Sequence, residues 1–420
     1  MQTVEIDRTA VAEWYAKNRA RTRALFDMVA EAAYYTRPIA LRNPIVFYEG
    51  HLPAFSIIAF LNRGLGRPGV DAPFERLFER GIDPEEEQDA VPRSGAGTTW
   101  PARLEVLGFA QRADTFVRDA TDNAPLDSPR AIEGLFTALE HEAMHQETLL
   151  YMWQQLPHAQ KTRPTYLPYE VKAPVPPRDV IRIPAGPATL GARRDARTFG
   201  WDNEFDAHAV EVSDFDVDAH SVTNADYLPF VEAGLAEPPT FWVKDGGRWC
   251  WRGMFENIPL PMAWPVYVSH DAATAFAQSK GRRLLTEAEY HRAAFSSPSG
   301  GEREYPWGSA PPDRTRGHFD FASWSPVPAG ARPAGASAWG VHDLVGNGWE
   351  WTSTVFGPFD GFSAMASYPE YSADFFDGQH YVMKGASPAT ARELIRRSFR
   401  NWFRPNYPYV YAKFRTARSL

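Results

Sequence analysis

The chain has 420 residues, a formal net charge of −8 and a pI of about 5.8. An acidic chain of this kind lacks the basic face that nucleic acid or an anionic membrane surface requires, so neither is expected as a partner. The length exceeds that of a typical single domain and 44% of the residues are hydrophobic, so two domains with substantial cores are expected.

Cysteine usage and the first residues indicate a cellular compartment. The single cysteine, Cys250, excludes an internal disulfide framework and a cysteine-rich zinc site, and it fits a reducing compartment. The stretch Met1–Ala10 is polar and lacks the apolar core of a signal peptide. The most apolar window, Ile45–Leu61, contains Glu49 and His51 and is expected to be too short and polar to span a bilayer. We therefore expect a cytoplasmic protein that does not bind membranes.

The first 160 residues read as helical. Apolar residues repeat at helical spacing over residues 11–33, 44–61, 103–119 and 128–153. In the third of these segments the residues predicted to face inward are Leu104, Leu107, Ala110 and Phe116. Four helices predict a four-helix bundle, a fold that builds metal sites from facing helices in its core.

The fourth predicted helix carries two histidines at a spacing suited to metal binding. Ser128 is a natural N-cap and Pro129 suits the first helical position. His141 and His145 are four residues apart, so they project from the same face of the helix. Their neutral imidazoles could bind zinc, iron, copper or nickel, although such a pair without a third ligand is often an ordinary surface or core pair.

The candidate for the third ligand is His51, which lies in the apolar, aromatic run from Phe47 to Phe55. A histidine in such a run is either a satisfied core residue or a ligand held in a dry pocket. Because one residue on the second helix and two on the fourth suit the core of a bundle, the three histidines together favour the metal site.

Composition changes sharply along the second half of the chain. Residues 1–163 are assigned to the helical bundle, residues 164–178 to a proline-rich extended linker, and residues 179–420 to a second domain. The second domain shows short strands, glycine turns and many tryptophans, with a strand pattern from Val210 to Val217. Helices are expected over 270–280 and after Thr286, which can cap its helix. The expected fold class is α+β.

Both halves resemble one known family. The bundle resembles a DinB-like four-helix bundle through Gly50-His51 and the pattern His141-x-x-x-His145-x-Glu147. The second domain resembles the C-type-lectin-like fold of formylglycine-generating, sulfatase-modifying enzymes. Its matching stretches are Ile183-Pro184-Ala185-Gly186, Arg283-Leu284-Leu285-Thr286-Glu287-Ala288-Glu289-Tyr290 and Asp343-Leu344-Val345-Gly346-Asn347-Gly348-Trp349-Glu350-Trp351-Thr352. The combination is similar to ergothioneine-type sulfoxide synthases and their relative, selenoneine synthase.

This resemblance implies a chemistry. The family holds a mononuclear non-haem Fe(II) with three histidines and uses O2 to join a thiol or selenol to the imidazole C2 of hercynine, which is trimethylated histidine. By resemblance the metal ligands are His51, His141 and His145. The residues themselves do not choose the metal, because three histidines with an open position also suit zinc.

The resemblance also implies catalytic and substrate-binding residues. A tyrosine of the second domain donates a proton or electron in this family, and Tyr368 matches it, with Tyr371 expected to help hold substrate. The alternative is that both are packing tyrosines in a loop. Asn401 and Trp402 match an Asn-Trp pair of the family, and an indole face attracts a quaternary ammonium. The alternative for Trp402 is a buried core tryptophan.

Three departures from the sulfoxide synthases concern the second substrate. Phe403 follows the Asn-Trp pair where enzymes that use gamma-glutamylcysteine carry an acid, and Met144 replaces a glutamine between the two helix histidines. An acidic run at 83–89 occupies much of the region where arginines clamp the peptide, although Arg93 follows it and could reach an anionic group. These changes suit a less charged donor such as a selenosugar, so the selenoneine-synthase branch is favoured.

Other functions stay open. A sulfoxide synthase that uses cysteine or gamma-glutamylcysteine would share the metal site and differ in the second pocket. A zinc-dependent thiol transferase would use the same three histidines without O2. Formylglycine generation relies on paired cysteines, which a chain with Cys250 alone does not have. A lectin-like binding module would leave the three histidines without a role.

Overall fold

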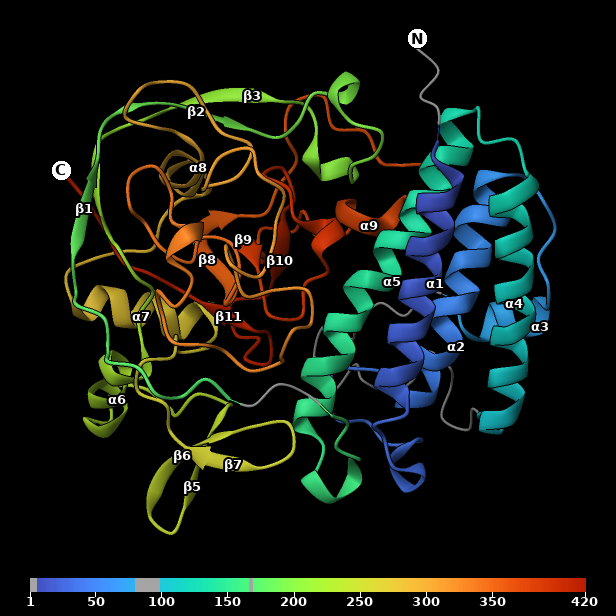
Figure 1. The fold of residues 1–420 in the computed structure, drawn as a ribbon, viewed down its shortest axis with the longest axis horizontal. Helices are drawn as coiled ribbons and strands as arrows, with labels where there is room; N and C mark the ends of the chain where they lie inside the picture. The colour runs from blue at the N-terminus through green and yellow to red at the C-terminus, as the bar shows by residue number, and fades with distance from the viewer. Residues whose placement is uncertain (1–5, 80–98, 166–168) are drawn as a thin grey trace. The chain divides into compact units, whose positions relative to one another are not determined.

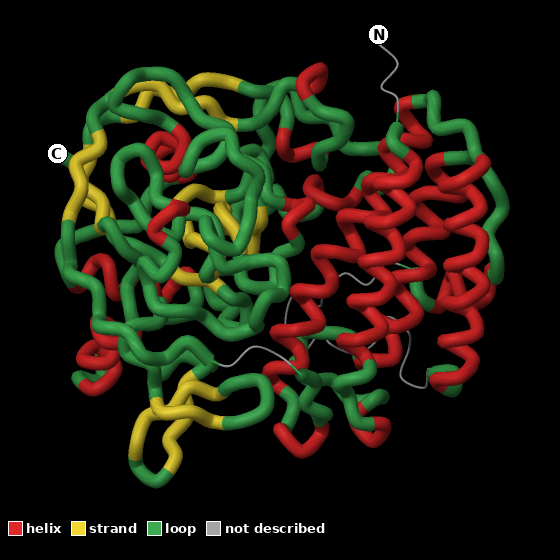
Figure 2. The backbone as a smooth tube through the Cα atoms, viewed as in Figure 1, coloured by secondary structure: helices red, strands yellow, loops and turns green. Residues whose placement is uncertain are grey.

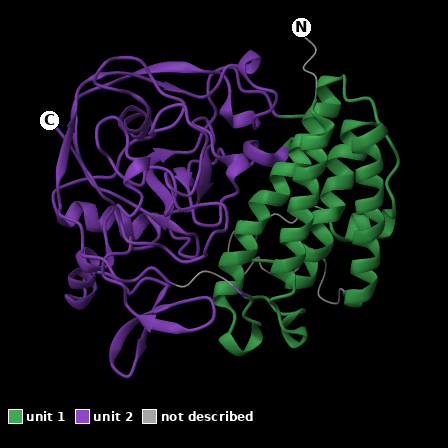
Figure 3. Ribbon diagram, viewed as in Figure 1, with its two compact units in different colours: residues 1–164, 365–369 green, residues 165–364, 370–420 purple. Residues whose placement is uncertain are grey.

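The computed structural model describes residues 6–79, 99–165 and 169–420. The chain divides into two compact units, coloured separately in Figure 3. Unit 1 comprises Met1–Pro164 together with the short later segment Met365–Pro369, and unit 2 comprises Thr165–Ala364 and Glu370–Leu420. Helices dominate unit 1, whereas unit 2 combines short strands, short helices and long loops (Figure 2). The expected α+β class, a helical bundle followed by a mixed domain, is confirmed.

Unit 1 is built on long helices that run side by side (Figure 1). A π-helical stretch, η2, continues α2 without a break. The helical elements of its described residues are α1 (Arg8–Phe26), η1 (Glu31–Ala33), α2 (Ile45–Ser56), η2 (Ile57–Gly64), α3 (Ala72–Leu77), α4 (Arg103–Asn123), α5 (Pro129–Gln155) and η4 (His158–Gln160). The predicted capping of α5 is confirmed, because the Ser128 side chain accepts a hydrogen bond from the Ala131 N–H and Pro129 occupies the first turn.

A buried ion-pair network joins three of these helices. Arg19 on α1 donates from Nε to Asp114 on α4 and from Nη1 to Glu142 on α5, both at 2.8 Å. The Thr22 hydroxyl donates to the same Glu142 carboxylate at 2.6 Å. A buried charge is tolerated only when it is paired and hydrogen-bonded. The network therefore fixes which face of α5 turns toward α1, and it leaves the other face for different partners.

Helix α5 also approaches η2 very closely. A Cβ atom placed on Gly134 would lie 2.4 Å from the carbonyl oxygen of Ala59 and 2.9 Å from the Cα of Gly64. No side chain fits at such distances, so the two backbones can meet this closely because residue 134 is glycine. This close approach sets the spacing between the two helices that carry the three histidines.

The predicted inward face of α4 is wrong. Leu104, Leu107 and Phe116 are 82%, 38% and 52% exposed, and of the four predicted residues Ala110 is the buried one. The buried apolar residues of α4 are Val106, Phe109, Ala110, Ala113, Val117 and Ala120. Both sets repeat at helical spacing, so the apolar pattern alone does not choose between them. The choice is made by the partners of α4, among them Arg19 on α1, which donates to the buried Asp114 of α4.

One described helical stretch, Ile45–Gly64, passes the length and composition test for a membrane span, contrary to the expectation that this window is too short and polar. However, 89% of that stretch is buried inside the protein. Burial of this extent is what the central helix of a packed bundle requires.

Unit 2 contains four small sheets within its described residues, ordered β1-β4-β12, β10-β9-β8-β11, β2-β3 and β5-β6-β7. The strands are β1 (Val180–Ile183), β2 (Gly186–Leu190), β3 (His208–Val212), β4 (Phe215–Asp218), β5 (Trp242–Asp245), β6 (Arg248–Arg252), β7 (Asn257–Pro259), β8 (Gly348–Val355), β9 (Tyr381–Ala386), β10 (Asn401–Phe403), β11 (Ala412–Lys413) and β12 (Ala417–Ser419). The strand pattern predicted from Val210 to Val217 is thus two strands, β3 and β4, which pair in different sheets.

The helices of unit 2 are short. They are α6 (Asn224–Glu232), α7 (His270–Ser279), α8 (Glu287–Phe295) and α9 (Glu370–Ala373), with 3-10 turns η5 (Arg194–Ala196), η6 (Asp202–Glu204), η7 (Pro333–Gly335) and η8 (Arg392–Leu394). Thr286 caps α8 as predicted, in a capping box with Glu289.

A second buried ion-pair network lies in the four-stranded sheet of unit 2. Glu350 on β8 stands opposite Lys413 on the parallel strand β11, and it also accepts from Arg415 Nε at 2.7 Å. All three side chains are completely buried. Burial opposes the ionised form of Glu350, but the charges of Arg415 and Lys413 outweigh it and lower its pKa from 4.5 to about 2. The carboxylate is therefore ionised in the folded protein at neutral pH.

Candidate metal centre

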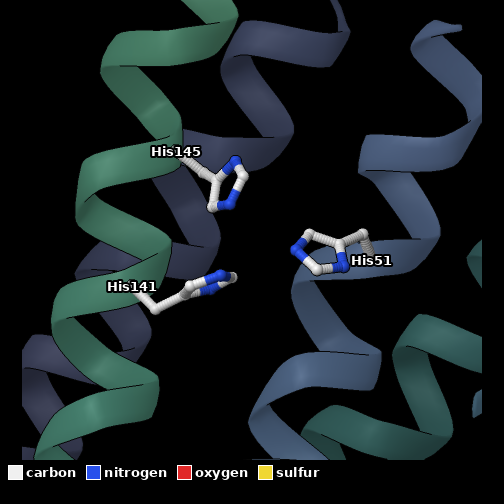
Figure 4. A group of neighbouring side chains, drawn as sticks. All are labelled: His51, His141 and His145. Carbon is white, nitrogen blue, oxygen red and sulfur yellow. The ribbon is translucent and has the colours of Figure 1, made fainter. Parts of the chain in front are cut away.

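Three histidines meet in the interior of unit 1. His51 projects from α2 and faces His141 and His145, which project from α5 one turn apart (Figure 4). Each residue offers one ring nitrogen, and these three nitrogens lie within 4.8 Å of one another. The structure thus brings together the three histidines that the sequence singled out.

Aromatic rings form the walls around this cluster. Phe55, four residues after His51 on the same helical segment, stacks on the His141 ring with centroids 3.5 Å apart and an interplanar angle of 12°. Phe47 stacks on the His51 ring at 5.0 Å, and Tyr48 contacts the His145 ring at 5.9 Å. His51 and His141 are each 3% exposed. The rings are therefore held in fixed orientations and largely shielded from water.

The protonation states suit metal ligands. Burial lowers the pKa of His51 from 6.5 to about 4, although the hydrogen bond to Phe78 acts in the opposite direction. Burial, together with the charges of the neighbouring histidines, also holds the pKa of His141 well below its usual value, and burial and the His51 charge do the same for His145. A neutral imidazole is the form that binds a metal ion.

The remaining hydrogen-bonding capacity also fits a metal ion. The Nδ1 of His51 lies 2.9 Å from the carbonyl oxygen of Phe78, which assigns the proton to Nδ1 and leaves Nε2 as an electron-pair donor. Among the described residues, the buried Nδ1 atoms of His141 and His145 have no hydrogen-bond partner. Buried polar atoms without partners are costly, and coordination of an ion by the three rings offsets such a cost. The donor set therefore fits a mononuclear centre with three histidine ligands.

The close packing of Phe78 explains why the residue before His51 is a glycine. A Cβ atom on Gly50 would lie 2.4 Å from the Phe78 ring, so the absence of a side chain lets Phe78 pack where its carbonyl accepts from His51. We predict that Gly50→Ala displaces Phe78, costs about 1–3 kcal/mol of stability by overpacking and weakens metal binding about tenfold to hundredfold through loss of the His51 hydrogen bond. Thermal melts and an anaerobic Fe(II) titration measure both effects.

Gly108→Ala is the matched control for this prediction. A Cβ atom on Gly108, in α4, would meet one atom of Arg112 at an ordinary 3.7 Å. This variant should bind Fe(II) as the wild type does and be equally or slightly more stable, by up to about 1 kcal/mol. Equal metal affinity in Gly50→Ala and Gly108→Ala would contradict the role assigned to the Phe78 contact.

Tyr368 lies beside this cluster and Tyr371 lies elsewhere. Tyr368 belongs to the segment Met365–Pro369 of unit 1, and its ring centroid is 4.9 Å from that of Phe55 and 6.0 Å from that of His141. Tyr371 belongs to unit 2, where it stacks on Trp201 at 3.8 Å and meets Trp402 edge-on at 5.1 Å. The two candidate tyrosines are therefore in different surroundings, and Tyr368 is the one in the unit that holds the histidines.

The other predicted substrate residues of unit 2 lie in β10. One face of the Trp402 indole is covered by Phe356, which stacks on it at 4.1 Å and 7°, so the predicted cation–π contact concerns the opposite face. The Asn401 side chain accepts from the backbone N–H of Trp402 at 2.9 Å. Phe403 stacks on Tyr407 at 5.2 Å. All of Asn401, Trp402 and Phe403 are half-buried.

Two further predictions concern unit 1. Met144 lies on α5 between the two ligand histidines and is half-buried. Arg93 and the acidic run at 83–89 lie outside the described residues. Arg103, the next arginine along the chain, pairs with Glu49 on α2 at 3.0 Å.

Several residues of the site were missed by the sequence analysis. Phe55 repeats the four-residue spacing from His51, which places both on one face of the helix and could have drawn attention to it. Phe78 and Ser367 carry no comparable signal, because their hydrogen bonds, to His51 and Thr137, join positions far apart in the chain.

Comparison with known proteins places the chain in a family. It matches the DinB superfamily over residues 15–149 and the Sulfatase-modifying factor enzyme 1-like domain over residues 168–420. It is 31% identical to a protein named hercynine oxygenase from Mycolicibacterium smegmatis, over 98% of this chain and 99% of that one. It is 27% identical to ergothioneine biosynthesis protein 1 from Neurospora crassa over 94% of this chain and 56% of that protein, so it spans about half the length of the fungal relative.

A DinB-type bundle with a three-histidine cluster, joined in one chain to a Sulfatase-modifying factor enzyme 1-like domain, defines a class of two-domain oxidoreductases. The chain belongs to the ergothioneine sulfoxide synthase family within that class. It is an enzyme that forms a carbon–chalcogen bond.

Proposed function

We propose that the protein is a hercynine oxygenase that uses Fe(II) and O2 to join the sulfur of a small thiol to the imidazole C2 of hercynine. The observation that carries the proposal is the buried cluster of His51, His141 and His145 in a chain that matches relatives named hercynine oxygenase along almost its whole length. The three neutral imidazoles are a donor set suited to iron.

The overall reaction balances without a further reductant. The imidazole C2–H bond and the thiol S–H bond break, a C–S bond forms, and the sulfur is oxidised to the sulfoxide. One oxygen atom of O2 enters the product and the other leaves as water with the two released hydrogen atoms, so O2 takes up all four electrons. Bound iron would supply open positions for O2 and the reacting groups.

In this reaction the residues of the chain bind hercynine, shield the metal ligands from water and supply a proton. The rings of Phe47 and Phe55 shield the ligands from water and hold them in place. We propose that the Tyr368 hydroxyl is the group that holds and delivers a proton beside the ligands, since its ring contacts both Phe55 and His141. We also propose that the face of the Trp402 indole opposite Phe356 binds the trimethylammonium group of hercynine.

We predict that Tyr368→Phe slows formation of the carbon–sulfur product by about a hundredfold to ten-thousandfold, the range for loss of a general acid, and diverts O2 toward oxidation of the thiol. Tyr371→Phe is the matched control, because it removes a hydroxyl while keeping the ring that packs on Trp201 and Trp402. Mass spectrometry measures the ratio of the carbon–sulfur product to oxidised thiol in each variant. Wild-type rate and products in Tyr368→Phe would move the role to another residue.

A selenol remains a second candidate for the chalcogen donor. Phe403, stacked on Tyr407, supplies an aromatic ring after the Asn-Trp pair in place of a carboxylate, and Met144 supplies a thioether in place of an amide. Both changes favour a donor with less charge than gamma-glutamylcysteine. The relatives are named for hercynine and ergothioneine, which favours sulfur.

A substrate competition tests the proposal. Protein loaded with Fe(II) without oxygen is mixed with hercynine, then given O2 together with cysteine, gamma-glutamylcysteine or a selenosugar, and the products are identified by mass spectrometry. A sulfoxide formed from a thiol supports the proposed function. A selenium adduct formed from the selenosugar alone keeps the metal centre and replaces the donor.

The same experiment separates the zinc alternative from the proposed function. A zinc-dependent thiol transferase would turn over with Zn²⁺ and without O2, whereas the proposed reaction stops when either Fe(II) or O2 is withheld.

Cytoplasmic location also stays a prediction. It is based on the single cysteine, Cys250, which is buried and unpaired.

A further inference from the structure

Ser367 anchors the short segment Met365–Pro369 to the helices of the bundle. Its backbone N–H donates to Oε1 of Glu133 at 2.7 Å, and its hydroxyl donates to the same oxygen at 2.8 Å. The Thr137 hydroxyl lies 2.8 Å from the Ser367 hydroxyl, and Arg63 Nη1 donates to the Ser367 carbonyl oxygen at 3.0 Å. The backbone N–H, the carbonyl oxygen and the hydroxyl of Ser367 are thus all hydrogen-bonded to residues of α5 and η2, and the residue is 3% exposed. We call these three partners, Glu133, Thr137 and Arg63, the Ser367 clamp.

Two members of the clamp lie on α5, the helix that carries two of the three histidines. Glu133, Thr137, His141 and His145 follow one another along α5 at intervals of four residues. Each residue in this series lies one turn above the one before it and on nearly the same side of the helix. The helix is continuous from Pro129 to Gln155, so its hydrogen-bonded backbone fixes the distance between the clamp and the two histidines. The third member, Arg63, lies in η2, which packs closely on α5 at Gly134.

The residue that follows the clamp is Tyr368. Its backbone is restricted from both sides, because Ser367 is fixed by hydrogen bonds and the residue before a proline, here Pro369, is confined to extended conformations. Its ring then meets Phe55 at 4.9 Å, and Phe55 in turn stacks on His141. A chain of rigid contacts therefore runs from α5 through Ser367 to the tyrosine ring and back to α5 through Phe55.

We propose that Glu133, Thr137 and Arg63 are positioning residues that hold Tyr368 at a fixed place beside the three histidines. The inference rests on the role proposed above for Tyr368. None of the three residues is a predicted metal ligand, so loosening the clamp should move the tyrosine while leaving metal binding intact. The expected signature is a partial version of the Tyr368→Phe effect, with a lower turnover rate and more oxidised thiol.

The test uses Glu133→Ala, Thr137→Val and Ser367→Ala in the full-length chain. Thr137→Val keeps the volume of the side chain and removes its hydroxyl, so it should fold as the wild type does. Thr137→Ser keeps the hydroxyl and should behave as the wild type. Thr115→Val on α4 is the matched control, because the Thr115 hydroxyl is exposed and bonds to a carbonyl of its own helix, that of Gln111.

Three measurements are made on each variant. Hydrogen–deuterium exchange of the metal-free protein should show faster exchange over residues 365–369 in the clamp variants. Anaerobic Fe(II) titration should give affinities within about twofold of wild type. Turnover should fall about tenfold to hundredfold, the effect of a displacement of roughly 1 Å, with little change in KM and a larger share of oxidised thiol.

The outcomes separate this inference from the proposed function. Unchanged exchange over 365–369, or faster exchange with wild-type rate and products, overturns the positioning role. Tyr368→Phe is measured alongside. If it loses activity while the clamp variants do not, the clamp inference alone fails. If Tyr368→Phe and the clamp variants all behave as wild type, both the clamp inference and the proposed role of Tyr368 fail.

Discussion

Replacing His141 with alanine should remove the metal ion from the protein and abolish turnover while the bundle stays folded. His141 supplies one of three ring nitrogens that lie within 4.8 Å of one another, and two remaining ligands hold an ion far more weakly than three. Metal content should fall from about one ion per chain to background, because a site of this kind binds through all its ligands together. Elemental analysis of anaerobically loaded protein measures this directly.

A second readout does not depend on activity. An ion that binds the folded state alone raises stability by about 4 kcal/mol at a concentration a thousandfold above Kd. Fe(II) should therefore raise the Tm of the wild type and leave that of His141→Ala unchanged. His158→Ala is the control, because His158 belongs to η4 beyond the end of α5 and outside the cluster. Retained iron in His141→Ala would refute the ligand assignment.

Replacing Glu350 with glutamine should destabilise unit 2 by about 3–5 kcal/mol, the usual cost of leaving buried charges without their partner. The substitution keeps the size of the side chain but leaves Lys413 and Arg415, both fully buried, beside a neutral amide. Urea unfolding followed by tryptophan fluorescence reports on this unit, since Trp14, Trp100 and Trp153 are in unit 1 and the other eleven of the 14 tryptophans are in unit 2. Glu237→Gln, an exposed position of the same unit, should unfold as the wild type does.

The effect of Glu350→Gln should depend on pH. The pKa of Glu350 is lowered from 4.5 to about 2 in the folded state, so the ionised carboxylate adds stability above about pH 4.5. That contribution is lost as the pH falls from 4.5 toward 2, where Glu350 itself becomes neutral. The difference in stability between wild type and Glu350→Gln should therefore shrink over this range, and a constant difference would contradict the ion-pair account.

Local signals predicted the helices that carry the histidines. The N-cap Ser128 and the spacing of His141 and His145 act within one helix, so a sequence pattern is enough to recognise them. The orientation of α4 was not predictable in this way, because apolar residues occupy two of its faces. The partners of α4 determine which face is buried. The face that carries Asp114 and its ion pairs is buried, whereas Leu104 and Phe116 are exposed.

Contacts between distant positions set the limit of the sequence analysis. Resemblance to a family suggested Tyr368, but nothing local indicates that Ser367 bonds to Thr137, 230 positions earlier. Phe78 accepts from His51 across 27 positions, and the sequence marks this contact only through the glycine at position 50. Such contacts depend on how helices pack, which short-range patterns do not encode.

Because residues 365–369 belong to unit 1, the unit that holds the three histidines is built from two separate stretches of the sequence. A fragment that ends at Pro164 would encode all three histidines and omit Tyr368 and Ser367, so its chemistry would not represent that of the intact chain. A protease cut between residues 164 and 178 should likewise leave the two pieces associated under native conditions, because hydrogen bonds from the later piece to Glu133 and Thr137 still hold it to the earlier one.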